Sequence, residues 1–169
     1  LGGKKLVVVY QNDDFGQQGL TAMKEDVVNY DGVEIVKEIN FLATDQDLSA
    51  QAQQIKQADP DVILFFGTTV PAASLRQELH KINATDIPYV VNSIGGADKV
   101  SFTLAGEDVW EGTYSMLSNL QSGVSDSPEL KLFEEEITKA YGEENVSQFS
   151  LVGWAQGLIL IEALKRSGD

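Results

Sequence analysis

Short runs of β-branched and aromatic residues alternate in this chain with stretches of helical periodicity, and this alternation constrains the fold more than any other feature. Three runs end in small or polar residues: 5–10 before 11–16, 62–66 before 67–69, and 89–91 before 92–96. Strands that alternate with helices form parallel sheets through right-handed crossovers, and ligands bind at the carboxyl ends of such strands. The sequence therefore predicts a fold and the edge of it that carries function.

The pattern predicts five strands in all. Strands are expected over 5–10, 34–41, 61–66, 89–92 and 111–117, with 34–41 as an edge strand that has one face in solvent. Helices are expected over 17–30, from an N-cap at Asp45 to about Ala58, from Pro71 onward, over part of 97–105, and after the Ser127-Pro128 start. These elements predict a doubly wound α/β domain: a mainly parallel five-stranded sheet of flavodoxin-like order, with helices on both faces in three layers.

The last segment, 147–166, differs from the other predicted helices. Its apolar residues go nearly all round a helix: Phe149, Leu151, Val152, Trp154, Leu158, Leu160, Ile161 and Leu164. A helix of this kind is normally buried on most sides. We therefore expect it to need a partner surface.

Charge and cysteine content exclude several classes of partner and chemistry. The chain has 26 acidic and 12 basic residues, a net charge of −14, which repels nucleic acid phosphates and anionic lipid surfaces. It has no cysteine, which excludes disulfides, thiolate metal sites and thiol nucleophiles. No run reaches the roughly 20 apolar residues that cross a bilayer, and no signal peptide is recognised. Because the chain begins at Leu1 rather than Met, we expect it to come from a longer protein.

Motifs of common enzyme chemistries are missing from the sequence. It has neither common form of phosphate-binding glycine loop and no Gly-x-Ser-x-Gly elbow. The single histidine, His80, lies within a predicted helix without a positioned partner, and we interpret it as solvated. Asp13-Asp14 would suit a magnesium-dependent phospho-acceptor domain, but no acceptor carboxylate follows the third strand. We therefore expect no catalytic residue, no metal site and no cofactor, and interpret the two aspartates as a polar turn before a helix N-terminus.

The candidate ligand site consists of uncharged residues at strand ends. Phe15 lies in the loop after the first predicted strand, and the other candidates follow the third and fourth strands: Thr68, Thr69, Asn92, Ser93 and Ile94. Hydroxyl and amide groups donate and accept hydrogen bonds without charge, as in the wall of a small-molecule pocket. The alternative is that these polar residues only cap helix N-termini, and the same residue can do both.

Several motifs together resemble a known family. The segment 4–19 resembles the opening of the second lobe of type I periplasmic binding proteins, in the leucine/isoleucine/valine-binding branch that serves ABC importers. Further similar segments follow in the family's order: 45–55, 58–64, 110–112 and 153–164. Each motif is loose, but their order and spacing are specific. The resemblance covers nearly the whole chain.

The resemblance implies a two-lobe protein that closes on its ligand by a hinge. It implies that 1–146 form the second lobe and that 147–169 is a crossover helix returning toward a first lobe outside this chain. Phe15 holds the position of a ligand-contacting aromatic that is more often Tyr. Thr68 and Thr69 hold the positions after the third strand. Ser93 holds the position of an acid that pairs with a ligand ammonium, so that position does not supply the counter-charge that a branched-chain amino acid meets in relatives.

The resemblance also implies a function and partners. It implies a non-catalytic lobe of an extracytoplasmic solute-binding protein, periplasmic or lipid-anchored, that captures an amino acid or related polar solute for the membrane permease of an ABC importer. The alternative with the same fold is the sensor domain of a transcription regulator or receptor. The alternative from another class is a doubly wound enzyme or a phospho-receiver domain, which the missing motifs disfavour. Without its first lobe, the fragment is expected to dimerise through the terminal helix.

Overall fold

The computed structural model describes residues 3–117, 120 and 125–168. The chain forms two compact units, Leu1–Met116 and Leu117–Asp169, called unit 1 and unit 2 below. The predicted division at residue 147 stays a prediction, since it concerns a lobe outside this chain.

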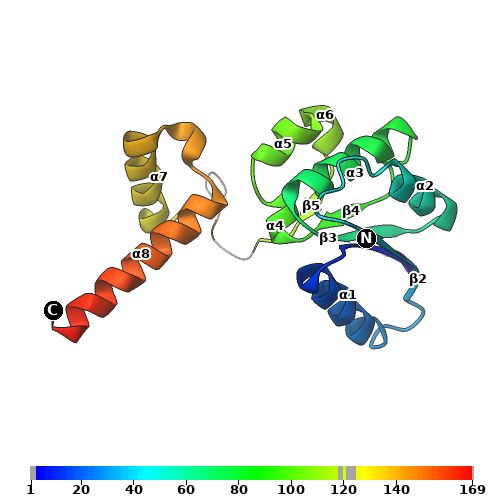
Figure 1. Ribbon diagram of the computed structural model, residues 1–169, viewed down its shortest axis with the longest axis horizontal. Helices are drawn as coiled ribbons and strands as arrows, with labels where there is room; N and C mark the ends of the chain where they lie inside the picture. The colour runs from blue at the N-terminus through cyan, green and yellow to red at the C-terminus, as the bar shows by residue number, and fades with distance from the viewer. Residues whose placement is uncertain (1–2, 118–119, 121–124, 169) are drawn as a thin grey trace. The chain divides into compact units, whose positions relative to one another are not determined.

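Unit 1 is built on a parallel sheet of five strands (Figure 1). The strands are β1 (Lys5–Gln11), β2 (Glu34–Phe41), β3 (Val62–Phe66), β4 (Tyr89–Val91) and β5 (Tyr114–Ser115), in the order β2-β1-β3-β4-β5. This order confirms the flavodoxin-like prediction and places β2 at an edge. The order reverses between β1 and β3, where Tyr10 is in register with Phe66. The carboxyl ends of these two strands therefore meet at the switch point, where open α/β sheets bind ligands.

Helices cover both faces of this sheet. They are α1 (Asp14–Val27), α2 (Ser49–Ala58), α3 (Thr69–Lys81), α4 (Ser93–Gly96), α5 (Val100–Ala105) and α6 (Glu107–Trp110). One face packs Val8 and Tyr10 of β1 against Leu20 of α1. The other face packs the alternate strand residues, such as Val7 and Val9, into the larger core under α2 and α3. Figure 1 shows α1 on the opposite side of the sheet from α2 and α3, which confirms the three layers.

Two predicted helix starts are wrong. Helix α1 begins at Asp14, three residues before the predicted start, because the side chain of Asp13 caps it by accepting a hydrogen bond from the Gly16 amide. Phe15 therefore lies in the first helical turn and not in a loop. Helix α2 begins at Ser49, and Asp45 does not cap it. The Asp45 carboxylate accepts a hydrogen bond from the Leu42 amide instead and closes a local turn.

Other boundaries differ less from the prediction. Helix α3 begins two residues before Pro71, and β5 forms regular pairs over only two of the seven predicted residues. Residues 93–96, expected as a polar cluster, form the short helix α4. His80 is exposed in the last turn of α3, as interpreted from the sequence.

A buried arginine holds the carboxyl-terminal part of unit 1 to α3. The Arg76 side chain is only 3% exposed, and its guanidinium donates hydrogen bonds to the carbonyl oxygens of Val109 at 2.9 Å, Glu111 at 3.0 Å and Thr85 at 3.3 Å. It also lies over the Tyr89 ring, 5.9 Å from the centroid. Burial lowers the pKa of Arg76 from its ordinary value. Backbone carbonyls therefore compensate this charge in place of a carboxylate.

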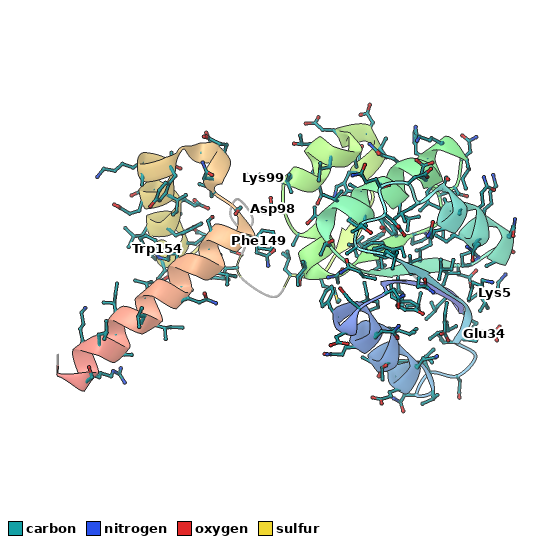
Figure 2. All side chains as sticks on the ribbon, viewed as in Figure 1. Lys5, Glu34, Asp98, Lys99, Phe149 and Trp154 are labelled. Carbon is teal, nitrogen blue, oxygen red and sulfur yellow. The ribbon has the colours of Figure 1, made fainter. Side chains whose placement is uncertain are left out.

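Unit 2 is helical in the part that the structure describes. It contains α7 (Pro128–Tyr141), the 3₁₀ helix η1 (Glu143–Asn145) and α8 (Gln148–Ser167). The predicted start of α7 is confirmed, since the Ser127 hydroxyl accepts a hydrogen bond from the Leu130 amide. A small core joins α7 to α8, with Phe133 edge-to-face against Trp154 at a centroid distance of 6.1 Å. Figure 2 labels Trp154 on α8.

Helix α8 is not covered as its composition predicts. None of its residues is buried, and its exposed apolar side chains are Phe149, Val152, Leu158, Ile159, Leu160, Ile161 and Leu164. Leu117, Leu120 and Leu130 line an apolar groove of about 720 Å³ together with one side of this helix. The described part of unit 2 therefore leaves most of the helix surface without a partner. Among the helices that the structure describes, none is long and apolar enough to cross a membrane.

Candidate functional site

The carboxyl ends of β1, β3 and β4 bring polar side chains together at one edge of the sheet. At the end of β3, the Gly67 amide donates a hydrogen bond of 3.1 Å to Oδ1 of Asn92, the residue after β4. The Thr69 hydroxyl donates at 2.9 Å to the carbonyl oxygen of Ile94 in α4. These two bonds join the loops after β3 and β4. The sequence prediction that these residues share one edge is confirmed.

Phe15 reaches the same edge through a close approach of two backbones. A side chain on Gly16 would place its Cβ 2.0 Å from the carbonyl oxygen of Gln11, so only glycine allows α1 to begin against the end of β1. This contact fixes the first turn of α1, which carries Phe15. The Phe15 ring is 38% exposed, so it is available to a ligand.

The two candidates at helix N-cap positions do not cap their helices with their side chains. Thr68 and Asn92 occupy the N-cap positions of α3 and α4, but neither side chain makes the capping hydrogen bond. The Thr68 hydroxyl donates instead to Oε1 of Gln11 at 3.3 Å. The alternative that these two residues only cap helices is therefore wrong.

The six predicted residues differ in how accessible they are. Phe15, Thr68 and Ile94 are exposed, Thr69 and Ser93 are half-buried, and Asn92 is buried. The Ser93 hydroxyl has no hydrogen-bond partner in residues 3–117, so it is free to bind a ligand. Asn92 is better placed to hold the two loops together than to contact a solute.

Gln11 is a residue of this edge that the sequence prediction missed. Its side chain is only 5% exposed, and its Nε2 donates a short hydrogen bond to Oδ2 of Asp13. Its amide thereby links Asp13 to Thr68. A glutamine at the end of an otherwise apolar strand was the available signal, but the two partners are visible only in three dimensions.

Asp13 places a negative charge at the edge. Its Oδ1 accepts the Gly16 amide at 3.0 Å and its Oδ2 accepts Gln11. The Gly16 hydrogen bond, followed by the one from Gln11, lowers the pKa of Asp13, so its carboxylate is ionised at neutral pH. The edge lies at the opposite end of the strands from Lys5 and Glu34, register partners at the start of β1 and β2 that Figure 2 labels.

The edge offers hydrogen bonds and apolar contact, and it lacks the grouped ligands of a metal site. In the part of the chain that the structure describes, no cluster of three or more histidine, aspartate or glutamate side chains could hold a metal ion. An aromatic ring, an isoleucine and several hydroxyls surround the switch point. This arrangement is typical of a pocket wall for a small organic molecule.

A family described as periplasmic binding protein matches residues 1–169, the whole chain. The chain belongs to the periplasmic binding protein family. The resemblance stated from the sequence is thereby confirmed, and the family is a class of substrate-binding proteins.

Curated relatives and solved structures agree with this membership. The Leu/Ile/Val-binding protein homolog 7 of Brucella abortus is 24% identical over 165 residues, which are 96% of this chain and 41% of that protein. An amino acid ABC transporter substrate-binding protein from Pseudomonas fluorescens matches with a TM-score of 0.84 at 17% identity, covering 99% of this chain and 44% of that one. A leucine-binding protein from Thermotoga maritima matches with a TM-score of 0.82 at 23% identity, covering 99% and 46%.

These likenesses confirm the α/β fold of the periplasmic binding protein family for this chain. The chain spans about two fifths of the length of the curated relatives that it matches.

Proposed function

We propose that unit 1 is one wall of the ligand cleft in a substrate-binding protein that captures an amino acid or related small solute for an ABC importer. The observation that carries this proposal is the meeting of polar side chains from β1, β3 and β4 at the switch point of a parallel sheet. Membership of a solute-binding family supports it. The names of similar proteins support the solute class: one structure holds isoleucine, and another holds 3,4-dihydroxybenzoic acid.

The proposed contacts follow from exposure and free hydrogen-bonding capacity. Phe15 and Ile94 supply apolar contact, and Thr68, Thr69 and Ser93 supply hydroxyl oxygens. Asn92 belongs to the site as its support. We propose no catalytic step, cofactor or metal at this edge.

The second wall of the cleft is proposed to come from a first lobe outside this chain. The terminal helix, predicted over 147–169, is proposed to pack on that lobe, since α8 leaves most of its apolar residues exposed. Hinged closure of the two lobes would then enclose the solute.

The proposed location is extracytoplasmic, either in the periplasm or lipid-anchored at the cell surface, and the proposed protein partner is the membrane permease of an importer. Family membership supports both. The net charge of −14 is consistent with a protein that does not bind nucleic acid.

The test uses the full-length protein and calorimetric titration with isoleucine, leucine, valine and 3,4-dihydroxybenzoate. We expect at least one probe to bind, and Phe15→Ala and Ser93→Ala each to weaken that probe about tenfold, which is roughly 1.4 kcal/mol. Thermal midpoints should change little, since both side chains lie outside the core. His80→Ala, at the far end of α3, is the matched control and should bind normally.

Two results would oppose the proposal. Normal binding by both Phe15→Ala and Ser93→Ala would show that the pocket lies elsewhere. Micromolar or tighter binding by the isolated 169-residue chain would contradict a two-walled cleft, because loss of one wall is expected to remove about 4 kcal/mol, or a thousandfold in Kd.

A further inference from the structure

A chain of hydrogen bonds runs from a fixed charge to the exposed hydroxyl of Thr68. The Asp13 carboxylate accepts from Nε2 of Gln11, and Oε1 of Gln11 accepts from the Thr68 hydroxyl at 3.3 Å. Gln11 is buried and Thr68 is exposed. Gln11, the middle member, is therefore positioned by protein groups on both sides, whereas Asp13 and Thr68 at the two ends face solvent.

The direction of these hydrogen bonds is fixed by Asp13. An ionised carboxylate only accepts, so the Gln11 amide must turn its NH₂ group toward Asp13 and its oxygen toward Thr68. An amide oxygen also only accepts, so the Thr68 hydroxyl donates its single proton to Gln11. The Thr68 oxygen can then only accept hydrogen bonds from groups in the solvent.

The hydroxyl of the neighbouring Thr69 also donates its proton within the protein. The proton of Thr69 goes to the carbonyl oxygen of Ile94 at 2.9 Å, which leaves its oxygen as an acceptor as well. Both threonines after β3 therefore offer acceptors to a molecule at this edge.

We propose that Asp13 and Gln11 are positioning residues that lock Thr68 as a hydrogen-bond acceptor, so that the ligand group facing it is a donor such as an ammonium, an amide N–H or a hydroxyl. A ketone oxygen or a carboxylate in that place would meet only lone pairs. This inference rests on the proposed function, because it assigns one chemical requirement to the same cleft wall.

The sharpest test is Asp13→Asn in the full-length protein. The introduced side chain keeps its oxygen as the cap for the Gly16 amide, which makes asparagine nearly as good an N-cap as aspartate. Its NH₂ group then faces Gln11, whose amide must turn over and donate to Thr68. The Thr68 hydroxyl is thereby released to donate outward, so one isosteric change reverses the hydrogen-bond polarity at the edge.

The probes are L-isoleucine and (S)-3-methyl-2-oxopentanoate, which share a carbon skeleton and differ in an ammonium or a keto oxygen at the α-carbon. We expect the unaltered protein to prefer isoleucine by at least about tenfold in Kd. In Asp13→Asn, we expect this preference for isoleucine to fall at least about tenfold, so that the two probes bind about equally or the keto acid binds more tightly. A purely structural role for Asp13 would weaken both probes alike and leave the ratio unchanged, which would overturn the proposal.

Gln11→Met and Gln17→Met form a matched pair of controls. Gln11→Met removes the link and lets the Thr68 hydroxyl rotate, so the ratio of the two affinities should approach one. Gln17 is exposed and its side-chain amide donates to Oδ1 of Asn12 at 3.3 Å, so the same substitution there should leave the ratio as it was. Equal ratios in the two variants would overturn the role of Gln11.

A neutron structure of the full-length protein tests the direction of these hydrogen bonds without any ligand. Deuterium on the Thr68 oxygen should point to Gln11, and the Gln11 ND₂ group should point to Asp13. The opposite arrangement would overturn the inference even if isoleucine binds. If neither probe binds, the amino-acid proposal fails for these solutes, whereas the deuterium positions still support or refute the locked hydroxyl.

Discussion

At the scale of single residues, the candidate site depends on how closely backbone segments approach at the end of β1. Gly16 lies against the Gln11 carbonyl, and the same Gln11 carries the amide that meets Asp13 and Thr68. A displacement of the first turn of α1 would therefore move Asp13 and Phe15 together. Local packing and the proposed ligand contact are therefore coupled at this point of the fold.

Gly16→Ala is expected to destabilise unit 1 by roughly 2 kcal/mol or more, because the added methyl group would overlap backbone atoms that cannot rotate away. Urea unfolding followed by Trp110 fluorescence, in a Trp154→Phe background, measures the effect on unit 1 alone. Gly153→Ala, in α8 of unit 2, is the control: nothing lies within 4 Å of its added methyl group, and the unfolding of unit 1 should be unchanged. A Gly16→Ala midpoint equal to that of the parent would contradict the close approach.

At the scale of elements, the strands and most helices follow from residue patterns, whereas helix starts depend on which amide each polar side chain meets. Asp13 and Asp45 both precede helical periodicity, but Asp13 caps α1 and Asp45 bonds the Leu42 amide. Aspartate closes turns and caps helices by the same hydrogen bond, so sequence does not distinguish the two uses. The sequence pattern also did not predict the first turn of α1, because its aromatic residue, Phe15, is exposed and interrupts the apolar periodicity.

The candidate site was predictable to the same extent. Thr68, Thr69 and Asn92 were identified because parallel strands end at a common edge, which is a rule of topology. Gln11 was missed because its function comes from partners two and 57 positions away in the chain. The failure of Thr68 and Asn92 to cap their helices likewise depends on competing partners that no sequence spacing shows.

The reciprocal cap at the start of α8 gives a prediction at this scale. Ser147 accepts from the Ser150 amide at 3.1 Å, and Ser150 accepts from the Ser147 amide at 2.9 Å. Ser147→Ala is expected to destabilise unit 2 by about 1 kcal/mol, since the Ser150 amide in the first turn loses the hydroxyl that accepts its hydrogen bond. Thermal unfolding followed by Trp154 fluorescence, in a Trp110→Phe background, measures it. Ser167→Ala, in the last turn, should unfold within about 0.5 kcal/mol of the parent, and an equal effect of both changes would refute the cap.

At the scale of the whole chain, apolar surface and net charge act in opposite directions. Helix α8 exposes a run of apolar side chains from Leu158 to Ile161, whereas the net charge of −14 drives copies apart. Unit 1 has a closed core under both faces of its sheet, but the described part of unit 2 does not cover its own terminal helix. Association should therefore depend strongly on ionic strength.

We expect the isolated chain to self-associate through α8 and to do so more strongly at high salt. Light scattering at about 20 mM and 500 mM salt measures the apparent mass, and screening of the negative charge should raise it. Leu158→Glu should return the chain to a monomer at both salt concentrations. Ser167→Glu adds the same charge at the polar end of the helix and should leave association in place. A monomer at both concentrations for the parent chain would contradict the prediction.

The arginine beneath β4 has a consequence for the order of events when this chain is synthesised. Helix α3 emerges from the ribosome with Arg76 some 33 residues before the first of its two later carbonyl partners, Val109 and Glu111. Before Val109 and Glu111 are synthesised, burial of the guanidinium would leave its charge with the Thr85 carbonyl as the one available partner of the three. A nascent chain that ends before residue 109 should therefore keep α3 undocked, and the sheet should close cooperatively only once the segment through Glu111 is free of the exit tunnel.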